Sequence, residues 1–353
     1  MACKTYTLET LPISAINCLN SEHNSFFCSF SWYENFVDTV LNRENNCSAQ
    51  FIVYDKNNAI HAVLALKVLT TLKRGGGLAF ESLGNYYSPF FQLNKQFDNL
   101  DVLDFFVNFK QIHKNWETLV LRGMDKQEIL KLSSTLKKSS LPSIPFYCFA
   151  NWYLEVNDRS FDEYFAGLSS KVRNTVLRKT RQFNLIEGAR IEIIHKEDEL
   201  ETAIQAFQDV YALSWKSEET FPDFISGLIR MASKQGTLRL GIAYINNIAI
   251  ASQLWIVSDE TAYIYKLAYD EKYKKLTTGT ILTATLMRYA IDVDKVKCVD
   301  YLSGDDAYKK EWMSHRRERW GIMVFNWRTL SGCLKMINQY TRFYFKKFFI
   351  KRK

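Results

Sequence analysis

The stretch that most constrains the fold is a strand, a basic turn and a helix in direct succession over residues 262–291. Residues 262–269 are mostly apolar and aromatic, as is typical of a strand, whereas residues 281–291 have the spacing of an amphipathic helix. The turn between them contains lysines, threonines and one glycine. Hydroxyls, a glycine and the free N–H groups of a helix start suit the binding of phosphate. The sequence therefore predicts an anion-binding turn in a sheet-containing fold.

Further strand-like segments flank this turn. Residues 237–244 and 248–257 meet at a two-asparagine turn, which is the pattern of a hairpin. Residues 297–302 form another apolar strand, which runs into a polar loop at 303–310. The C-terminal half therefore contains three strands, a phosphate-binding turn, a helix, one more strand and a polar loop.

Five short segments within residues 150–328 carry a more specific signal. They are Ser214-Trp215-Lys216, Gln253-Leu254-Trp255, Tyr265 to Asp270, Thr278-Gly279-Thr280 and Gly304 to Trp312. Their order and composition resemble the GNAT acyltransferase superfamily. Within it, the chain is similar to the FemAB-like branch, which includes the acetyltransferase-domain proteins associated with cellulose and exopolysaccharide biosynthesis.

This resemblance implies a fold of the α/β (α+β) class with two tandem GNAT-like units, each a mixed, mostly antiparallel sheet flanked by helices. The clearest boundary is residues 139–145, which contain two of the five prolines and three serines. We therefore expect a degenerate GNAT-like domain at 1–145. A GNAT acyltransferase domain, with a basic amphipathic helix at its end, is expected at 146–353.

The N-terminal half repeats strand and helix patterns but lacks the motifs of the C-terminal half. Gly75-Gly76-Gly77 is not followed by the Lys-Ser/Thr pair of a phosphate-binding loop, so we interpret it as a turn or bulge. The predicted elements are a helix at 32–41, a hairpin of strands at 51–54 and 60–69, a helix at 100–113, a strand at 117–121 and a helix at 126–138.

The net charge and the cysteines indicate which kinds of partner and which cellular compartment to expect. The formal net charge of +8 favours an anionic partner: a nucleotide-bearing donor, nucleic acid or an acidic membrane face. Seven scattered cysteines without a CxxC pair indicate reduced thiols, and we expect no metal site. The N-terminus lacks a signal-peptide pattern, and no apolar run reaches the roughly 18 residues of a membrane span. We expect a cytoplasmic protein, or one peripheral at the inner face of the membrane.

The resemblance implies acyl-CoA, with acetyl-CoA foremost, as the donor. Its binding residues would be Lys274, Thr277, Thr278, Gly279 and Thr280. Thr278 can cap the helix, Gly279 lets the backbone approach a pyrophosphate, and Lys274 adds charge. Many GNAT members have an Arg/Gln-x-x-Gly-x-Gly/Ala loop here, whereas this chain has threonines and one glycine.

Four further residues are candidates for substrate binding. Lys266 lies in a strand pattern with apolar Ile264 and Ala268, so we expect a carboxylate or a ligand over it, because a buried unpaired charge is costly. Gln253 can be either a structural partner or a ligand-binding residue. Trp215 and Lys216, at the end of a helix predicted at 197–217, can contact substrate or form a core aromatic with a snorkelling lysine.

A basic helix is predicted at 169–183. Arg178 and Arg181 share one face of it with Lys171 and Asn174. This face can be a solvated surface, or it can bind the phosphates of the donor or acceptor. A helix with the same basic character occurs at this place in FemAB-like proteins, which favours the second interpretation.

Candidate catalytic residues follow the strand at 297–302. By resemblance to GNAT enzymes, Tyr308 would protonate the departing thiolate. Asp305 can accept the proton of the attacking group, or it can cap a short helix. Lys309 can hold a carboxylate or phosphate of the acceptor.

The leading hypothesis is an acyltransferase that acts on an amine or hydroxyl of a sugar or another small precursor, in polysaccharide or cell-envelope biosynthesis. One alternative is a FemAB-like transferase that depends on aminoacyl-tRNA, which the positive charge would suit. Another is a non-catalytic GNAT scaffold that binds anionic lipid or nucleic acid.

The C-terminal stretch, residues 334–353, has apolar and basic residues on different sides of a helix. This pattern is typical of an interfacial helix on an anionic membrane. A packed C-terminal helix with a frayed basic end fits the same pattern. The apolar side contains Leu334, Ile337, Tyr344, Phe345 and Phe348, and the basic side contains Lys335, Arg342 and Lys346.

Overall fold

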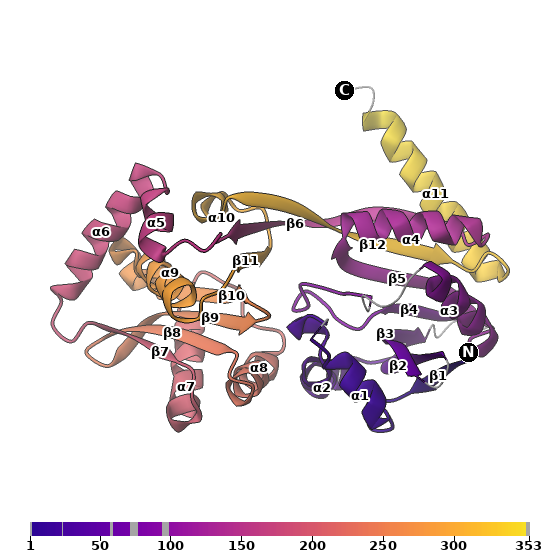
Figure 1. The fold of residues 1–353 in the computed structure, drawn as a ribbon, viewed down its shortest axis with the longest axis horizontal. Coiled ribbons are helices and arrows are strands. Elements are labelled where there is room, and N and C mark those ends of the chain that lie inside the picture. Colours follow the sequence, from indigo (N-terminus) through magenta and orange to yellow (C-terminus); the bar gives the residue numbers. More distant parts are fainter. Residues whose placement is uncertain (1, 23, 57–58, 71–76, 94–98, 351–353) are drawn as a thin grey trace. The chain divides into compact units, whose positions relative to one another are not determined.

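The computed structural model describes residues 2–22, 24–56, 59–70, 77–93 and 99–350 (Figure 1). The chain forms two compact units. The first unit comprises Met1–Phe149 and Glu318–Lys353, and the second comprises Ala150–Arg317. The chain passes from one unit to the other within two long strands, β6 (Ser143–Glu155) and β12 (His315–Phe325).

The first unit is a sheet in the order β1-β2-β3-β4-β5-β12 with helices on both faces. The helices α3 and α4 cover one face, where Phe105, Phe109 and Leu132 pack with Phe80 and Leu119 in the core. The pairing is antiparallel except between β4 and β5. The bounds are β1 Ala2–Tyr6, α1 Ile13–Leu19, η1 Phe26–Cys28, α2 Phe30–Thr39, η2 Leu41–Arg43, β2 Cys47–Lys56, β3 Ala59–Thr70, β4 Leu78–Ser82, α3 Asn99–Ile112, β5 Trp116–Asp125, α4 Lys126–Lys138 and α11 Leu330–Ile350.

The second unit is a sheet in the order β6-β11-β10-β9-β8-β7. The helices α6 and α9 cover one face, where Val176 and Leu282 pack with Trp255 and Ile264, and α7 contacts β9 and β10. All pairs are antiparallel except β10 with β11. The bounds are α5 Phe161–Ala166, α6 Ser170–Asn184, β7 Arg190–Ile194, η3 Glu197–Glu199, α7 Leu200–Ala212, α8 Pro222–Lys234, β8 Leu238–Ile245, β9 Ile248–Ser258, β10 Thr261–Tyr269, η4 Glu271–Leu276, α9 Thr278–Arg288, η5 Tyr289–Val293, β11 Cys298–Ser303 and α10 Ala307–Trp312.

These observations confirm the predicted fold class, since each unit is a mixed, mostly antiparallel sheet flanked by helices. The predicted strand, turn and helix over 262–291 correspond to β10, η4 and α9. Two predicted boundaries differ from the structure. The helix predicted at 197–217 ends at Ala212, which leaves Trp215 and Lys216 in the loop that follows. The loop predicted at 303–310 gives way at Ala307 to the helix α10, which runs to Trp312.

The division into units differs from the predicted domains at 1–145 and 146–353. Residues 318–353 belong to the first unit, because β12 pairs with β5 and α11 packs beside β5.

The glycine triplet is partly outside the described residues, which include Gly77 but not Gly75 and Gly76. A Cβ at Gly77 would lie 2.3 Å from the carbonyl oxygen of Asn115, so its lack of a side chain serves packing.

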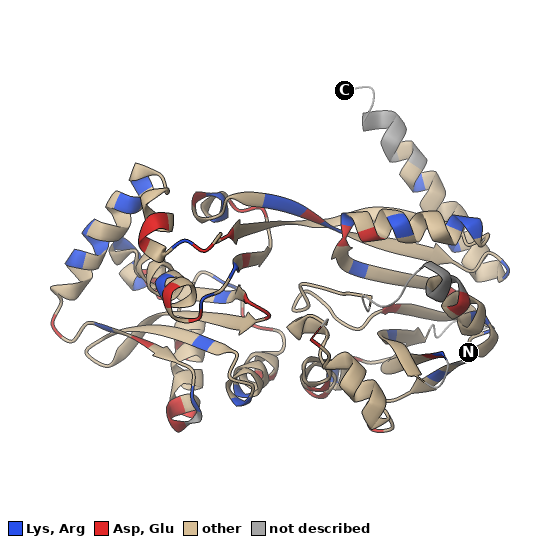
Figure 2. Ribbon diagram, in the orientation of Figure 1, with Lys and Arg blue, Asp and Glu red and all other residues tan. Residues whose placement is uncertain are grey.

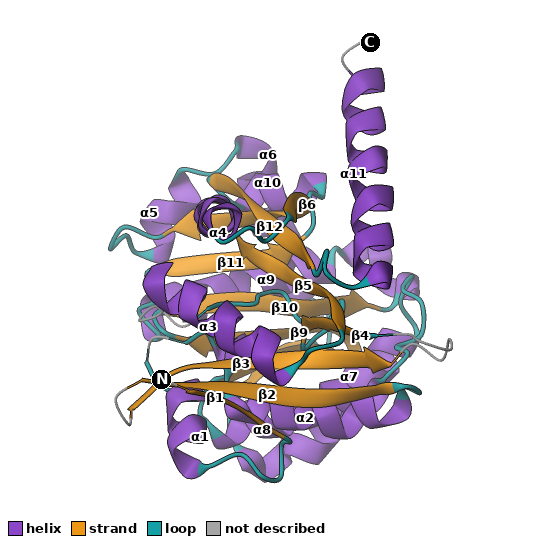
Figure 3. Ribbon diagram, turned by 90° about the vertical axis from the view of Figure 1, so that its right-hand side faces the viewer, coloured by secondary structure: helices purple, strands orange, loops and turns teal. Residues whose placement is uncertain are grey.

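The long C-terminal helix α11 begins against the sheet of the first unit. Its Tyr340 hydroxyl donates to the carbonyl oxygen of Ser143 (3.1 Å), and Lys335 forms an ion pair with buried Glu117. Figure 3 shows that the helix then extends beyond the sheet of its unit. Among the described residues, no helix is long and apolar enough to cross a membrane.

Candidate active site

The candidate site lies in the second unit, where β10 and β11 separate. The two strands pair over three residue pairs, and the ladder ends at Tyr263 and Asp300. β10 runs on to Tyr269, and a bulge beside Tyr265 shifts its register against β9. A cavity of about 410 Å³ is lined by Tyr269 from β10 and by Tyr301 from β11. The separation of two adjacent strands thus coincides with a cavity at the sheet.

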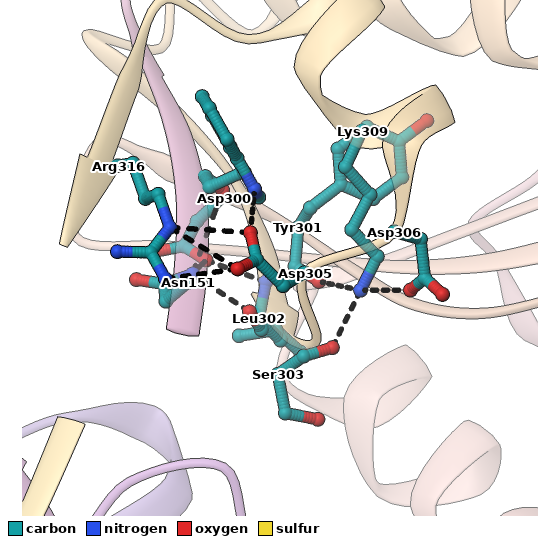
Figure 4. A network of polar contacts seen from close by, with 10 residues as sticks. Asn151, Asp300, Tyr301, Leu302, Ser303, Asp305, Asp306, Lys309 and Arg316 are labelled. Carbon is teal, nitrogen blue, oxygen red and sulfur yellow. Dashed lines mark hydrogen bonds and ion pairs between the residues drawn. The ribbon is translucent and has the colours of Figure 1, made fainter. Parts of the chain in front are cut away.

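A buried polar network fixes the end of β11 (Figure 4). The carboxylate of Asp300 is fully buried and accepts from the Asn151 amide and the Leu302 backbone N–H, both at 2.6 Å, and from the Arg317 guanidinium. Leu302 has a φ of 57°, and the register of β11 against β6 shifts between Asp300 and Ser303. The network therefore holds an irregular end of β11 at the point where it leaves β10.

The first turn of α9 lines the same cavity. Thr277, Gly279 and Thr280 contribute to the lining, and the first N–H groups of a helix have no acceptor within it. Thr277 adopts a left-handed conformation (φ 57°, ψ 36°), which is unusual for a β-branched residue. The side-chain oxygens of Thr277 and Thr278 are buried without a hydrogen-bond partner. This turn therefore offers unused donors where the helix dipole favours an anion.

Gln253 ties this turn to β9. Its side-chain amide donates to the carbonyl oxygen of Gly279 (2.9 Å) and to the Thr283 hydroxyl (2.8 Å), and its oxygen accepts from Trp255 Nε1 (2.9 Å). Gln253 lines the cavity, but these contacts occupy both ends of its amide. Of the two predicted roles, that of a structural partner therefore accounts for the contacts of Gln253. Its side chain positions the start of α9.

The short helix α10 brings two groups capable of proton transfer to the cavity. Tyr308 packs edge to face against Tyr301, with ring centroids 5.7 Å apart. Burial, assisted by the charge of Asp306, raises the pKa of Tyr308 to about 12, so its phenol keeps its proton at neutral pH. Glu311, one turn later, also lines the cavity and forms an ion pair with Lys171 of α6 at 2.7 Å.

The part of the chain that surrounds the cavity matches a known protein family. Residues 170–310 match the family model of the acetyltransferase (GNAT) domain. This segment belongs to the GNAT superfamily. It contains the separated strands, the start of α9 and most of α10, so the cavity lies largely within the GNAT domain. No curated protein has a sequence that matches the chain at a significant level.

Solved structures share the fold of the whole chain. FemX superposes with a TM-score of 0.65 at 11% identity, covering 94% of this chain and 100% of FemX. A conserved protein of unknown function from Bacteroides thetaiotaomicron gives 0.57 at 13%, covering 92% and 99%. L-PGS from Bacillus licheniformis gives 0.55 at 10%, covering 95% and 97%. At these identities the likeness is one of fold, and it extends over both units described above.

Lys266 lies on a different face of the GNAT domain from the one its spacing predicts. Ile264 packs in the core below α9, but the bulge beside Tyr265 moves Lys266 to the α7 side. Its ammonium group pairs there with Glu219 at 2.5 Å and lies over the ring of Tyr211. The partner expected over Lys266 is thus a carboxylate of the protein, and Lys266 does not line the cavity.

Trp215 and Lys216 lie beyond the end of α7. Trp215 lines the cavity and packs against Tyr269, with ring centroids 4.5 Å apart. The ammonium group of Lys216 lies over the rings of Trp215 and Tyr211, at 5.7 and 5.4 Å from their centroids. Burial, followed by repulsion from Lys266, lowers the pKa of Lys216 to about 8. Trp215 therefore contributes directly to the cavity wall, with Lys216 immediately behind its ring.

Asp305 and Lys309, which the sequence predicts to be catalytic, are not among the residues that line the cavity (Figure 4). Asp305 accepts from Trp152 Nε1 (2.7 Å) and pairs with Arg316 (2.8 Å). These contacts lower the pKa of Asp305 to about 2, which makes it a weak base. Asp305 is also not a helix cap, since the N-cap of α10 is Asp306.

Lys309 is buried and closes the loop between β11 and α10. Its ammonium group donates to the carbonyl oxygen of Ser303 (2.5 Å) and lies 3.5 Å from the Asp306 carboxylate. Gly304 has a φ of +121°, and a Cβ there would lie 2.7 Å from the Lys309 nitrogen. Lys309 therefore holds this loop in shape.

The other predicted cations lie outside the cavity. Lys274 is exposed and pairs with Glu271 at 3.4 Å. Arg178 and Arg181 are exposed on α6, which Figure 2 shows as a helix rich in lysine and arginine. Lys171, at the start of the same helix, is the basic residue that lines the cavity. Among the described residues, no cluster of His, Cys, Asp and Glu side chains could hold a metal ion.

Glu311 and Tyr301 line the cavity, although neither is among the predicted site residues. The sequence places Tyr301 in a strand and Glu311 in the segment from Gly304 to Trp312, with no role assigned to either. The short helix that Asp305 could have capped points to Glu311, because residues three apart in a helix share a face and Tyr308 is a candidate. The separation of β10 from β11, which exposes Tyr301 to the cavity, has no local sequence signal.

The lowered pKa of Lys216 predicts a distinctive pH dependence of stability. The unfolded chain keeps the lysine proton up to pH about 10.5, whereas the folded chain releases it near 8. Between these two pH values the unfolded state binds more protons than the folded state. The free energy of unfolding of the wild type should therefore rise with pH in this interval, relative to that of Lys216→Gln. Urea unfolding at several pH values between these limits measures this difference.

Lys297→Gln is the matched control for this experiment. Lys297 is exposed, and its hydrogen bond to Glu260 raises the pKa of its ammonium group, so it should show no such rise below pH 10.5. Parallel stability curves for wild type and Lys216→Gln would contradict the buried position of the Lys216 amine.

Proposed function

We propose that the GNAT domain is an acyltransferase that takes an acyl group from acyl-CoA, acetyl-CoA foremost, and transfers it to an amine or hydroxyl of a sugar or other small precursor in cell-envelope polysaccharide biosynthesis. The observation that carries the proposal is the cavity between the separated strands. It is lined by the first turn of α9, which has unused donors, and by the phenol of Tyr308. An anion-binding helix start and a proton donor beside one cavity both suit acyl transfer from a CoA thioester.

The residues at the start of α9 fit the phosphates of such a donor. Thr277 Oγ1 is buried without a partner, and Thr280 and Lys171 line the same cavity. Thr277 occupies the position of the first glycine in the loop of many GNAT members, and it has the left-handed conformation that glycine adopts easily. Thr277, Thr280 and Lys171 would therefore hold the donor's phosphates.

In the proposed reaction, the nitrogen or oxygen of the acceptor attacks the thioester carbonyl carbon, a C–N or C–O bond forms and the C–S bond breaks. Tyr308 gives its proton to the leaving sulfur, since its phenol is protonated at neutral pH. Glu311 takes the proton of the attacking group and returns it through solvent to Tyr308. Positioning of both reactants supplies the rest of the rate.

A second candidate is a FemAB-like transferase with an aminoacyl-tRNA donor. The observation that favours it is the exposed basic surface of α6, where Arg178 and Arg181 follow the cavity residue Lys171 along the helix. Such a surface can contact the phosphates of a polyanion. The aminoacyl ester would then occupy the same cavity. In the third candidate, a scaffold without activity, ligands would bind but not react.

A ligand screen tests the function. Acetyl-CoA, longer acyl-CoAs and CoA should raise the melting temperature by mass action, equivalent to about 2.7 kcal/mol at a hundredfold excess over the dissociation constant. Thr280→Glu should abolish the effect, because it places a negative charge at the cavity and the helix start. Thr220→Glu, at an exposed position outside the cavity, is the control.

The outcomes separate the three candidates. Stabilisation by acyl-CoA with acyl transfer to an amino sugar supports the proposal. No response to any CoA compound, with stabilisation by charged tRNA, would replace it with the tRNA-dependent reaction. Stabilisation by a ligand without turnover of any acceptor would support the third candidate, a scaffold without activity.

Tyr308→Phe tests the proton donor. The change removes one hydroxyl, so turnover should fall roughly 10²-fold or more while donor affinity is unchanged. Because the pKa of Tyr308 is raised to about 12, wild-type turnover should show no loss from this group as the pH rises through 10. Steady-state kinetics over this pH range provide the measurement. Tyr147→Phe, in the first unit, is the control, and full activity of Tyr308→Phe would remove this residue from the mechanism.

A further inference from the structure

One face of α11 presents an apolar stripe to solvent. Leu330, Leu334 and Ile337 are 80%, 59% and 54% exposed. Their spacing places them on one side of the helix. Single exposed apolar residues are common on protein surfaces, but an aligned series along one helix marks an interaction site.

The contacts that hold α11 to the first unit use other residues. The Tyr340 hydroxyl donates to Ser143, its ring packs 6.1 Å from Phe325 between centroids, and Lys335 pairs with Glu117. The stripe is therefore not the surface that docks the helix onto its own sheet. It is a second, separate face.

The charge of this segment indicates the chemistry of its partner. Residues 330–353 contain seven of the chain's lysines and arginines and no aspartate or glutamate. The formal net charge of the whole chain is +8, so nearly all of the excess lies in this segment. An apolar stripe with basic flanks matches the boundary of a bilayer that contains anionic lipid.

We propose that α11 is an interfacial helix that binds the first unit to an anionic lipid surface, with Leu334 and Ile337 inserted among the headgroups. Pairing of the stripe with that of a second copy is disfavoured, because it would bring two strongly basic segments together without an acidic residue in either. The inference is independent of the donor bound by the GNAT domain.

Vesicle sedimentation with the full chain tests the proposal. The protein should bind vesicles in which about a quarter of the phosphatidylcholine is replaced by phosphatidylglycerol, and binding should weaken as salt is raised. Binding to phosphatidylcholine alone should be at least about tenfold weaker. Equal binding to both vesicles, or binding to neither, would overturn the proposal.

Variants locate the surface. Leu334→Glu with Ile337→Glu should weaken binding at least about 100-fold, since two inserted apolar side chains become anionic. Leu185→Glu, at a position that is 86% exposed in the second unit, should leave binding unchanged. Circular dichroism and the melting temperature verify folding of each variant. Unchanged binding of the double variant would overturn the assignment to α11. The assignment would also be overturned if light scattering showed that the wild type is a dimer and the double variant a monomer.

Discussion

The buried carboxylate of Asp300 is the interaction on which the shape of the site depends. It lies where the ladder between β10 and β11 ends, and both of its oxygens are satisfied by Asn151, Leu302 and Arg317. A buried charge is tolerated only with such partners, and loss of one partner typically costs about 3–5 kcal/mol. The network thus stabilises an irregular strand end that an ordinary ladder would have straightened.

A second local irregularity, in the backbone at Thr277, lies at the start of α9. Thr277 is held in a left-handed conformation, and side chains in such regions typically cost about 1–3 kcal/mol. Gln253 fixes the following turn through the carbonyl oxygen of Gly279. Unfavourable conformations that persist in this way concentrate at functional sites. Here the strained residue also has a buried hydroxyl oxygen without a hydrogen-bond partner.

Local patterns in the sequence were sufficient for much of the fold. The strand, turn and helix from β10 to α9 follow from residue spacing alone, and the motif segments indicated the superfamily to which residues 170–310 belong. The side of the sheet on which Lys266 lies was not predictable, because one bulge reverses the alternation of faces. The role of Asp305 depends on Trp152, a partner 153 residues away in sequence. The return of β12 and α11 to the first unit likewise depends on long-range pairing with β5.

The central claim is that the donor occupies the cavity between β10 and β11. Hydrogen–deuterium exchange with and without saturating acetyl-CoA tests it most directly, because it reports where backbone amides become protected. The account predicts slower exchange at the first turn of α9, residues 277–283, and at the end of β11, residues 301–303. Protection confined to other segments, with unchanged exchange in both of these, would contradict the account.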